Sequence, residues 1–394
     1  MAPQQPLKKI LKNLDLNRRA GQNFIIHYTL RNQPGQAGFG SHGVRSLELV
    51  RLFAEEIEWT VEFLARIGLK LKGTRQRRVY VFDLAAAENF EGVPQVARDP
   101  GGKGRDKYLA VFLPSRTTLP SPEEEARYLR AAANHECTHI VCFDQGDLHG
   151  NLPDSGWVWF SEGTAEWVTL KRVRDLGGND FQSFEFLADW VAYPQISMVE
   201  EEAWYSSVIF VEYLERLRGA HWIADLWKGA TAKRDDDPWP KMQAACGEDV
   251  FLNFCCDAYF VNDPKGKLYY PELFERFGPR AWEHSYVGHT DGWVEGVVSD
   301  FGCLYFGLFP SGKNKALKIE LETKDPNVCA AVLTSNKEHH EIASRKTLKA
   351  SLPSVFGPAD PKGNHYVLVV TTQPSSSVRP QRRRGFRFRI AGED

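Results

Sequence analysis

The stretch NHECTHIVCF, residues 134–143, carries two histidines four residues apart, His135 and His139. On a helix, residues four apart are separated by about 6 Å of rise and nearly one turn, so both imidazoles project from one face and can share a metal ion. Glu136 points about 100° away, where its carboxylate can reach a water molecule at the metal without ligating the ion. Two ligands and a general base for metal-assisted hydrolysis therefore fit within five residues.

A chance origin of this pattern is improbable. With 11 histidines in 394 residues and glutamate at about 6%, His-Glu-x-x-His arises by chance about 0.02 times in such a chain. A catalytic zinc ion takes three protein ligands and keeps one position open, so two histidines do not complete the set. The stretch WVWFSEGTAEW, residues 157–167, supplies the rest: Glu162 is the predicted third ligand. Glu166, one helical turn later, is predicted to accept the N–H of a ligand histidine and fix its ring.

HECTH followed by WFSEGTAEW resembles the gluzincin metallopeptidases, particularly the branch called peptidase MA-like. The resemblance extends over about residues 75–260 and is specific around these two motifs. It implies a zinc-dependent hydrolase with Zn2+ held by His135, His139 and Glu162, and Glu136 as the base. Metzincins continue as HExxHxxGxxH, whereas this chain reads HECTHIVCFDQ, so that branch is rejected.

In the expected mechanism, zinc lowers the pKa of bound water toward about 7, and Glu136 takes the proton and passes it to the leaving amine. A further donor to the oxyanion is expected from AWYSSVIFVEYLERLRG, residues 203–219, which resembles the helix that supplies a tyrosine in several gluzincins. Tyr205 is the candidate. Two alternatives stay open: a one-residue slip onto Trp204, and Tyr205 as an interface aromatic residue.

The strand-like run YLAVFLP, residues 108–114, contains no carboxylate of the kind that gluzincin aminopeptidases use to bind a free α-amine. We therefore expect this strand to pair with an extended protein or peptide substrate by β-addition, as in an endopeptidase. Asp106 keeps an aminopeptidase open as the alternative. A hydrolase of non-peptide bonds and a non-catalytic binding protein on the same fold also stay open, although the intact Glu136 argues against the latter.

The elements that must hold these residues follow from hydrophobic periodicity and capping signals. Ser121 and Glu124 form a capping box with Pro122 at the first helical position, which predicts a helix start directly before the histidine motif. Helices are expected at 46–67, 121–143, 160–175, 199–218 and 239–259. Strands are expected at 24–29, 79–84, 108–113, 303–309, 316–322, 329–334, 366–372 and 386–390.

This order of elements predicts an α+β fold in which a zincin-like metallopeptidase domain precedes a C-terminal all-β sandwich domain. The expected divisions are residues 1–20 as a tail or short docked helix, 21–288 as the peptidase domain and 289–394 as the sandwich. The sandwich is expected to position substrate or to contact a glycan or a protein.

Composition limits the class of partner. The formal net charge of -2 argues against bulk attraction to nucleic acid, and no run of 18 apolar residues predicts a membrane span. Lysines interrupt the N-terminal 20 residues, so no signal peptide is expected. The chain is predicted to be cytoplasmic as written, or secreted if a signal peptide has been removed.

The other reactive side chains are expected to have structural rather than catalytic roles. The seven cysteines lack a CxxC pair and are expected to be buried free thiols, including Cys137 and Cys142 beside the histidines. Five further histidines lack partners at ligand spacing and are expected at the surface or as satisfied interior residues: His149, His284, His289, His339 and His340. The basic run at 379–389 alternates arginine with apolar residues, which is typical of a strand with one solvated face.

Overall fold

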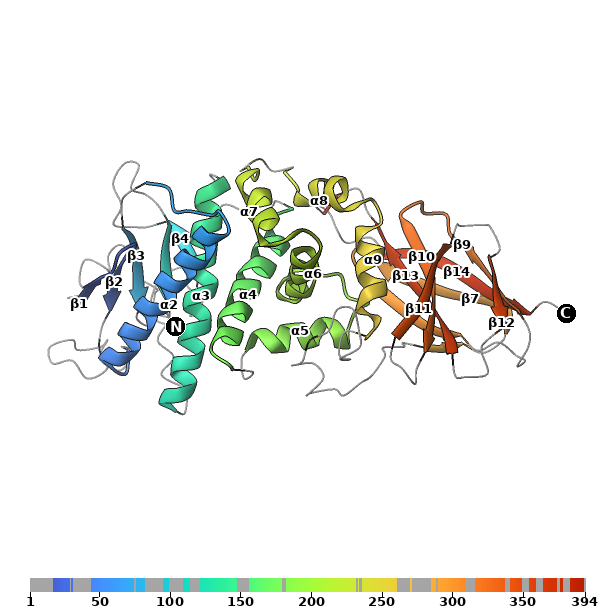
Figure 1. Ribbon diagram of the computed structural model, residues 1–394, viewed down its shortest axis with the longest axis horizontal. Coiled ribbons are helices and arrows are strands. Elements are labelled where there is room, and N and C mark those ends of the chain that lie inside the picture. The colour runs from blue at the N-terminus through green and yellow to red at the C-terminus, as the bar shows by residue number, and fades with distance from the viewer. Residues whose placement is uncertain are drawn as a thin grey trace, which may run out of the picture. The chain divides into compact units, whose positions relative to one another are not determined.

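A computed structural model describes the fold over residues 17–28, 30, 44–73, 76–81, 95–98, 109–113, 121–146, 156–178, 182–231, 233, 236–260, 270, 285–287, 290–308, 316–336, 341–348, 354–358, 364–373, 376–377 and 383–392 (Figure 1). Helices and strands alternate in the N-terminal part, helices fill the middle, and strands form the C-terminal part. The predicted mixed α and β fold with a C-terminal sheet region is therefore present.

The N-terminal sheet has five strands in the order β1-β2-β3-β5-β4. They are β1 (Asn17–Ala20), β2 (Phe24–Tyr28), β3 (Arg77–Val81), β4 (Gln95–Arg98) and β5 (Leu109–Leu113). Strands β2, β3 and β5 run parallel, whereas β4 pairs antiparallel with β5 at one edge. Strand β5 is thus an interior strand, and the prediction that it pairs with substrate is wrong, because β4 already occupies its other edge.

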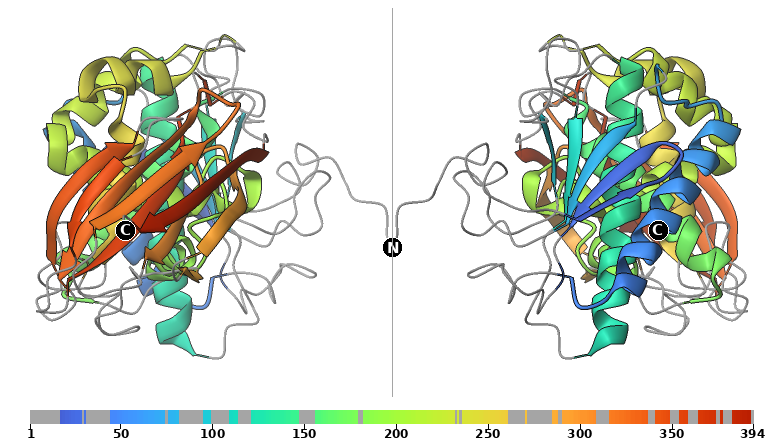
Figure 2. Two further views of the ribbon diagram at one scale, coloured as in Figure 1. Left: turned by 90° about the vertical axis from the view of Figure 1, so that its right-hand side faces the viewer. Right: turned by 90° about the vertical axis from the view of Figure 1, so that its left-hand side faces the viewer.

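Two long helices cover this sheet (Figure 2). Helix α2 (Leu47–Arg66) starts at Ser46, whose side chain accepts the N–H of Leu49. Helix α3 (Pro122–Gly146) starts at the predicted capping box, in which the Glu124 N–H donates to Ser121 Oγ at 3.1 Å and the Ser121 N–H donates to Glu124 Oε2 at 3.1 Å. Residues 132–143 of α3 are all buried, so the histidine motif lies in the interior.

The helices expected at 199–218 and 239–259 are each divided into shorter ones, whereas the helix expected at 160–175 is present. The middle helices are α4 (Val158–Asp175), α5 (Gln182–Ala192), the 3-10 helix η3 (Glu201–Ser207), α6 (Val208–Arg218), α7 (Ala220–Lys228), α8 (Pro238–Cys246), α9 (Val250–Asp257) and the 3-10 helix η4 (Ala258–Phe260). The expected helix 239–259 is divided because Gly247 adopts φ +97°, a conformation that favours glycine and ends α8. No helix in the described ranges is both long and apolar enough to cross a bilayer.

The C-terminal strands form two sheets, in the orders β11-β10-β13-β8-β6 and β12-β9-β14-β7. Their strands are β6 (Ser285–Val287), β7 (Thr290–Ser299), β8 (Cys303–Leu308), β9 (Ala316–Glu322), β10 (Val328–Asn336), β11 (Glu341–Leu348), β12 (Ser354–Pro358), β13 (Asn364–Thr372) and β14 (Arg383–Gly392). All pairs are antiparallel except β6 with β8. Both sheets contribute to one apolar core, in which Phe306 of β8 packs on Phe386 and Phe388 of β14.

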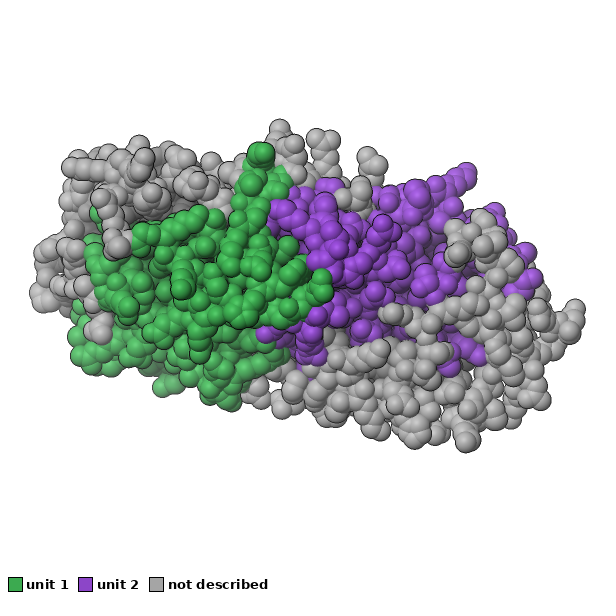
Figure 3. Space-filling view, turned by 45° about the horizontal axis from the view of Figure 1, so that its top comes forward, with its two compact units in different colours: residues 1–155, 164–183, 218–236 green, residues 156–163, 184–217, 237–394 purple. Residues whose placement is uncertain are grey.

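The chain divides into two compact units, each built from three segments (Figure 3). Unit 1 contains residues 1–155, 164–183 and 218–236, and unit 2 contains residues 156–163, 184–217 and 237–394. Unit 2 therefore combines helices such as α9 with the C-terminal strands, and the expected domain boundary at residue 289 stays a prediction. Helix α9 belongs to this unit because it lies against β10 and β13, and the Tyr305 hydroxyl of β8 donates to the Cys255 carbonyl oxygen of α9 at 2.7 Å.

Several expectations concern residues outside the described ranges. They are the N-terminal residues 1–16, Asp106, His149, His284, His289, His339 and His340. The seven cysteines are free thiols, of which Cys246 and Cys329 are half-buried and the others buried.

Candidate metal centre

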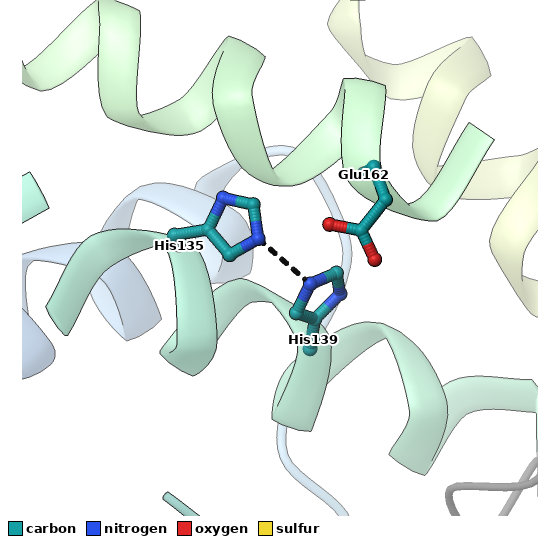
Figure 4. A group of neighbouring side chains, drawn as sticks. All are labelled: His135, His139 and Glu162. Carbon is teal, nitrogen blue, oxygen red and sulfur yellow. Dashed lines mark hydrogen bonds between the residues drawn. The ribbon is translucent and has the colours of Figure 1, made fainter. Parts of the chain in front are cut away.

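Helix α3 presents His135 and His139 from one face, and the carboxylate of Glu162 on α4 faces them (Figure 4). Metal-ligating atoms of these three side chains all lie within 4.8 Å of one another. The two histidines are 8% and 6% exposed, so their nitrogens are largely shielded from water. The three residues predicted as ligands are therefore brought together.

The spacing of the donor atoms fits a zinc ion. Two nitrogens at about 2.0–2.1 Å from a tetrahedral zinc are separated by about 3.3 Å. His135 Nε2 and His139 Nε2 lie 3.0 Å apart, with the rings nearly perpendicular at 81°. Two imidazoles and one carboxylate are also the ligand types that a catalytic zinc site uses. The donor set fits the metal that the sequence predicts.

Glu166 lies one turn beyond Glu162 on α4 and is 6% exposed. Its Oε1 is 2.8 Å from His135 Nδ1, which is the contact predicted for Glu166. An ionised carboxylate only accepts hydrogen bonds, so the proton of the neutral His135 ring belongs on Nδ1. The lone pair of Nε2 is then free to face His139 and Glu162, as metal ligation requires.

The ring of His139 is oriented by aromatic packing. It stacks on Phe143, one turn further along α3, with a centroid distance of 5.3 Å and an angle of 21°. Phe143 in turn packs against Trp227 of α7, whose indole Nε1 donates to Thr164 Oγ1 of α4 at 3.3 Å. Sequence reasoning missed this support, because Trp227 is distant from both motifs in the chain.

A buried carboxylate ties α2, α3 and α4 together. Glu56 of α2 is 1% exposed, and Arg172 of α4 donates to it through Nε at 2.7 Å and through a terminal nitrogen at 3.1 Å. Arg130 Nε and Asn134 Nδ2 of α3 donate to the same carboxylate at 2.9 and 3.1 Å. Asn134 directly precedes His135, so this network fixes the position of α3 next to the histidine motif. Its signal in the sequence is an acidic residue inside the apolar stripe of residues 46–67.

Glu136 is the candidate general base, whereas the neighbouring thiols of Cys137 and Cys142 are unreactive. Glu136 is 4% exposed and directly follows His135 on α3, and its role as the general base stays a prediction. Burial raises the pKa of the Cys137 thiol well above its ordinary value, and burial also raises the pKa of Cys142. The Cys137 Sγ–H points to the Ile57 carbonyl oxygen at 3.7 Å. These thiols stay protonated and pack in the interior, as the sequence predicts.

Tyr205 lies in η3 and is 37% exposed. Its ring stacks on Phe186 of α5 with a centroid distance of 4.7 Å and an angle of 19°. The neighbouring Trp204 donates its indole N–H to the Val199 carbonyl oxygen at 2.9 Å, within its own segment. The role of Tyr205 as an oxyanion donor stays a prediction.

Comparison with known proteins gives one family match. The model of a family described as "Family of unknown function (DUF6055)" matches residues 121–251, about a third of the chain. This segment contains α3 and α4 with both motifs. The search of curated proteins returned no match.

Solved structures similar to this chain cover about a quarter of it. PliG of Salmonella Typhimurium, a periplasmic lysozyme inhibitor of g-type lysozyme, is 10% identical with a TM-score of 0.20, covering 27% of this chain and 99% of its own. The pre-peptidase C-terminal domain of a collagenase from Bacillus anthracis is 8% identical with a TM-score of 0.21, covering 28% and 99%. Similarity at this level carries no inference about function.

Proposed function

We propose that this chain is a zinc-dependent peptidase of the gluzincin type, on a zincin-like fold. His135, His139 and Glu162 would hold the ion, Glu166 would orient His135, and Glu136 would be the general base. The observation that carries the proposal is the gathering of two buried imidazoles and one carboxylate within 4.8 Å, with a second carboxylate 2.8 Å from the outer nitrogen of one imidazole. When bound, a zinc ion supplies a Lewis acid that polarises the substrate carbonyl and lowers the pKa of water at the site.

The residues of the chain then divide the remaining work. Glu136 accepts a proton from the attacking water as the new C–O bond forms, and it delivers that proton to the amine nitrogen as the C–N bond breaks. Burial of the site excludes bulk water, which strengthens the electrostatic interactions on which proton transfer depends. Tyr205 is proposed as an additional donor to the carbonyl oxygen.

The proposed substrate is a protein or peptide cut within the chain. Because β5 is paired on both sides, an extended substrate that adds to this sheet would pair with an edge strand instead, and β4 is the edge strand next to β5. Pairing through backbone groups places no requirement on a free α-amine. This consideration favours an endopeptidase over an aminopeptidase.

Zinc stoichiometry and peptide cleavage test the proposal together. We expect one zinc per chain in the wild type, weakened binding in Glu162→Ala, and unchanged binding in Glu62→Ala, which alters an exposed residue of α2. An unfolded protein should be cleaved by the wild type, and a peptide with a blocked N-terminus should be cleaved as well as a free one. In Glu136→Gln zinc should be retained and cleavage lost. A wild-type chain that takes up no zinc, or a Gln variant with full activity, contradicts the proposal.

A further inference from the structure

The first turn of α4 is held by a residue from the far end of the chain. Trp159 lies three residues before Glu162 and is 2% exposed. Its indole Nε1 donates to Ser377 Oγ at 3.1 Å, across 218 residues of sequence. Ser377 is 4% exposed and lies between β13 and β14, so the connection between two C-terminal strands contacts the helix that carries the candidate third ligand.

Ser377 is itself fixed by a buried carboxylate. The Ser377 N–H donates to Asp237 Oδ2 at 2.6 Å, and its hydroxyl makes a short bond to Oδ1. Asp237 also accepts the Ser376 hydroxyl at 2.7 Å and the Trp239 N–H at 2.9 Å, which caps α8. With four donors on one carboxylate that is 7% exposed, the position of the Ser377 hydroxyl is well defined.

Two glycines show how close these contacts are. A Cβ on Gly156, before α4, would lie 2.9 Å from both Asp237 Oδ1 and Ser377 Oγ. A Cβ on Gly163, directly after Glu162, would lie 2.2 Å from Ser207 Oγ. The segment 156–163, which carries Glu162, is therefore closely packed at both ends against neighbouring backbone and side chains.

Phe301 supplies a second contact from the C-terminal strands. It lies in the turn between β7 and β8 with φ +56°, a left-handed conformation that is uncommon for a non-glycine residue. Its N–H donates to Thr372 Oγ1 at 3.1 Å, which holds the turn. In this conformation the Phe301 ring stacks on Trp159 with a centroid distance of 6.3 Å and an angle of 30°.

We propose that the C-terminal strands are a structural part of the metal centre, and that Ser377 and Trp159 are positioning residues for Glu162. The inference rests on the proposed function of Glu162 as a zinc ligand. Residues three apart on a helix are neighbours, and a helix transmits a shift of its first turn to the next. Loss of the Ser377 contact would allow the Glu162 carboxylate to move away from the position that ligation requires.

Full-length variants and zinc titration test the inference. Ser377→Ala removes the acceptor, Trp159→Phe removes the donor while keeping an aromatic ring, and the double variant removes both. The matched controls are Ser197→Ala and Trp190→Phe, since the Ser197 hydroxyl and the Trp190 indole N–H are buried without a hydrogen-bond partner within the described ranges. Each single variant should raise the zinc Kd about 3- to 10-fold, a loss typical of one hydrogen bond.

The zinc Kd of the double variant should not exceed the higher Kd of the two single variants, because both substitutions remove the same Trp159–Ser377 hydrogen bond. Amide hydrogen exchange in the metal-free chain provides a readout that does not depend on zinc. Exchange in the first turns of α4 should be faster in Ser377→Ala and unchanged in Ser197→Ala.

The outcomes separate this inference from the proposed function. Zinc bound by the wild type with the same Kd in Ser377→Ala overturns the inference and leaves the proposed function standing. Equal weakening by Ser377→Ala and Ser197→Ala also overturns it, because a general loss of stability would then be the cause. A wild-type chain that binds no zinc overturns the proposed function and the inference with it.

Discussion

His135 Nδ1 of α3 and Glu166 Oε1 of α4 lie 2.8 Å apart in the interior, although the two residues are 31 positions apart in sequence. The contact assigns the ring proton of His135 to Nδ1 and directs Nε2 toward His139 and Glu162. A carboxylate in this position typically contributes 10- to 100-fold, in order of magnitude, to metal affinity.

We therefore expect Glu166→Ala to weaken zinc binding by about 10- to 100-fold, and Glu166→Gln to weaken it less, because a glutamine oxygen can still accept the N–H. Competition with a chromogenic chelator measures both affinities. Glu62→Ala, which changes an exposed carboxylate of α2, serves as the control. Equal zinc affinity in wild type and Glu166→Ala would rule out the orienting role.

Glu56→Ala should destabilise the chain by about 3–5 kcal/mol, because it leaves the charges of Arg130 and Arg172 without their buried partner. Urea unfolding followed by tryptophan fluorescence measures the loss. Glu55→Ala, which changes the exposed neighbour on α2, should alter stability by less than about 0.5 kcal/mol. A similar effect from both variants would refute the assigned role of the Glu56 network.

Gly163→Ala should destabilise the chain by about 1–3 kcal/mol, because the new methyl group would lie 2.2 Å from Ser207 Oγ and 3.1 Å from a Val211 methyl. The sign of the change in stability is informative, because alanine normally stabilises a helix interior by about 1 kcal/mol relative to glycine. Thermal unfolding should show a lower Tm. Gly385→Ala, where a Cβ meets nothing within 4 Å, should leave the Tm nearly unchanged. A Tm raised by Gly163→Ala would contradict the close packing at this turn.

The buried thiols predict alkaline sensitivity. Burial raises the pKa of Cys329 to about 11, and burial also raises the pKa of Cys137 and Cys142. Between about pH 9 and 11 the unfolded chain releases these protons while the folded chain keeps them, so the free energy of unfolding falls as pH rises. Urea midpoints between pH 8 and 11 test this expectation, and Cys329→Ala should reduce the dependence of the free energy of unfolding on pH.

At pH 8, iodoacetamide should not modify Cys137 or Cys142 in the folded chain, and rapid modification would contradict their burial.

The sequence predicts the two motif helices well because their signals are local. The capping box at Ser121 is present. The second motif helix ends near the expected residue 175, where Gly177 adopts φ +68° and the Gly178 N–H donates to the Val173 carbonyl oxygen at 3.1 Å. The ligand spacing within α3 follows from helix geometry alone. The contact between Glu166 and His135 could be proposed because both residues lie in those helices.

The strand pairing, the division of the middle helices and the packing of α9 depend on contacts between distant residues, which local sequence patterns do not reveal. Strand β4 consists of only four residues, QVAR, which are too few to show a strand periodicity, so the sequence does not predict that β4 pairs with β5. The expected helix 199–218 is divided into η3 and α6 at Ser207, whose hydroxyl donates to the Trp204 and Trp159 carbonyl oxygens. The grouping of α9 with the C-terminal strands likewise depends on packing between distant segments.

The contact between Trp159 and Ser377 also bears on the order of folding during synthesis. At about 5–20 residues per second, a ribosome needs roughly 10 to 40 s to extend the chain from one residue to the other. During this interval the histidine helix and the sheet behind it can form, whereas the start of α4 still lacks its anchor. On the proposed function, a nascent chain would therefore acquire its ability to hold zinc tightly only near the end of translation, after the C-terminal strands have been made.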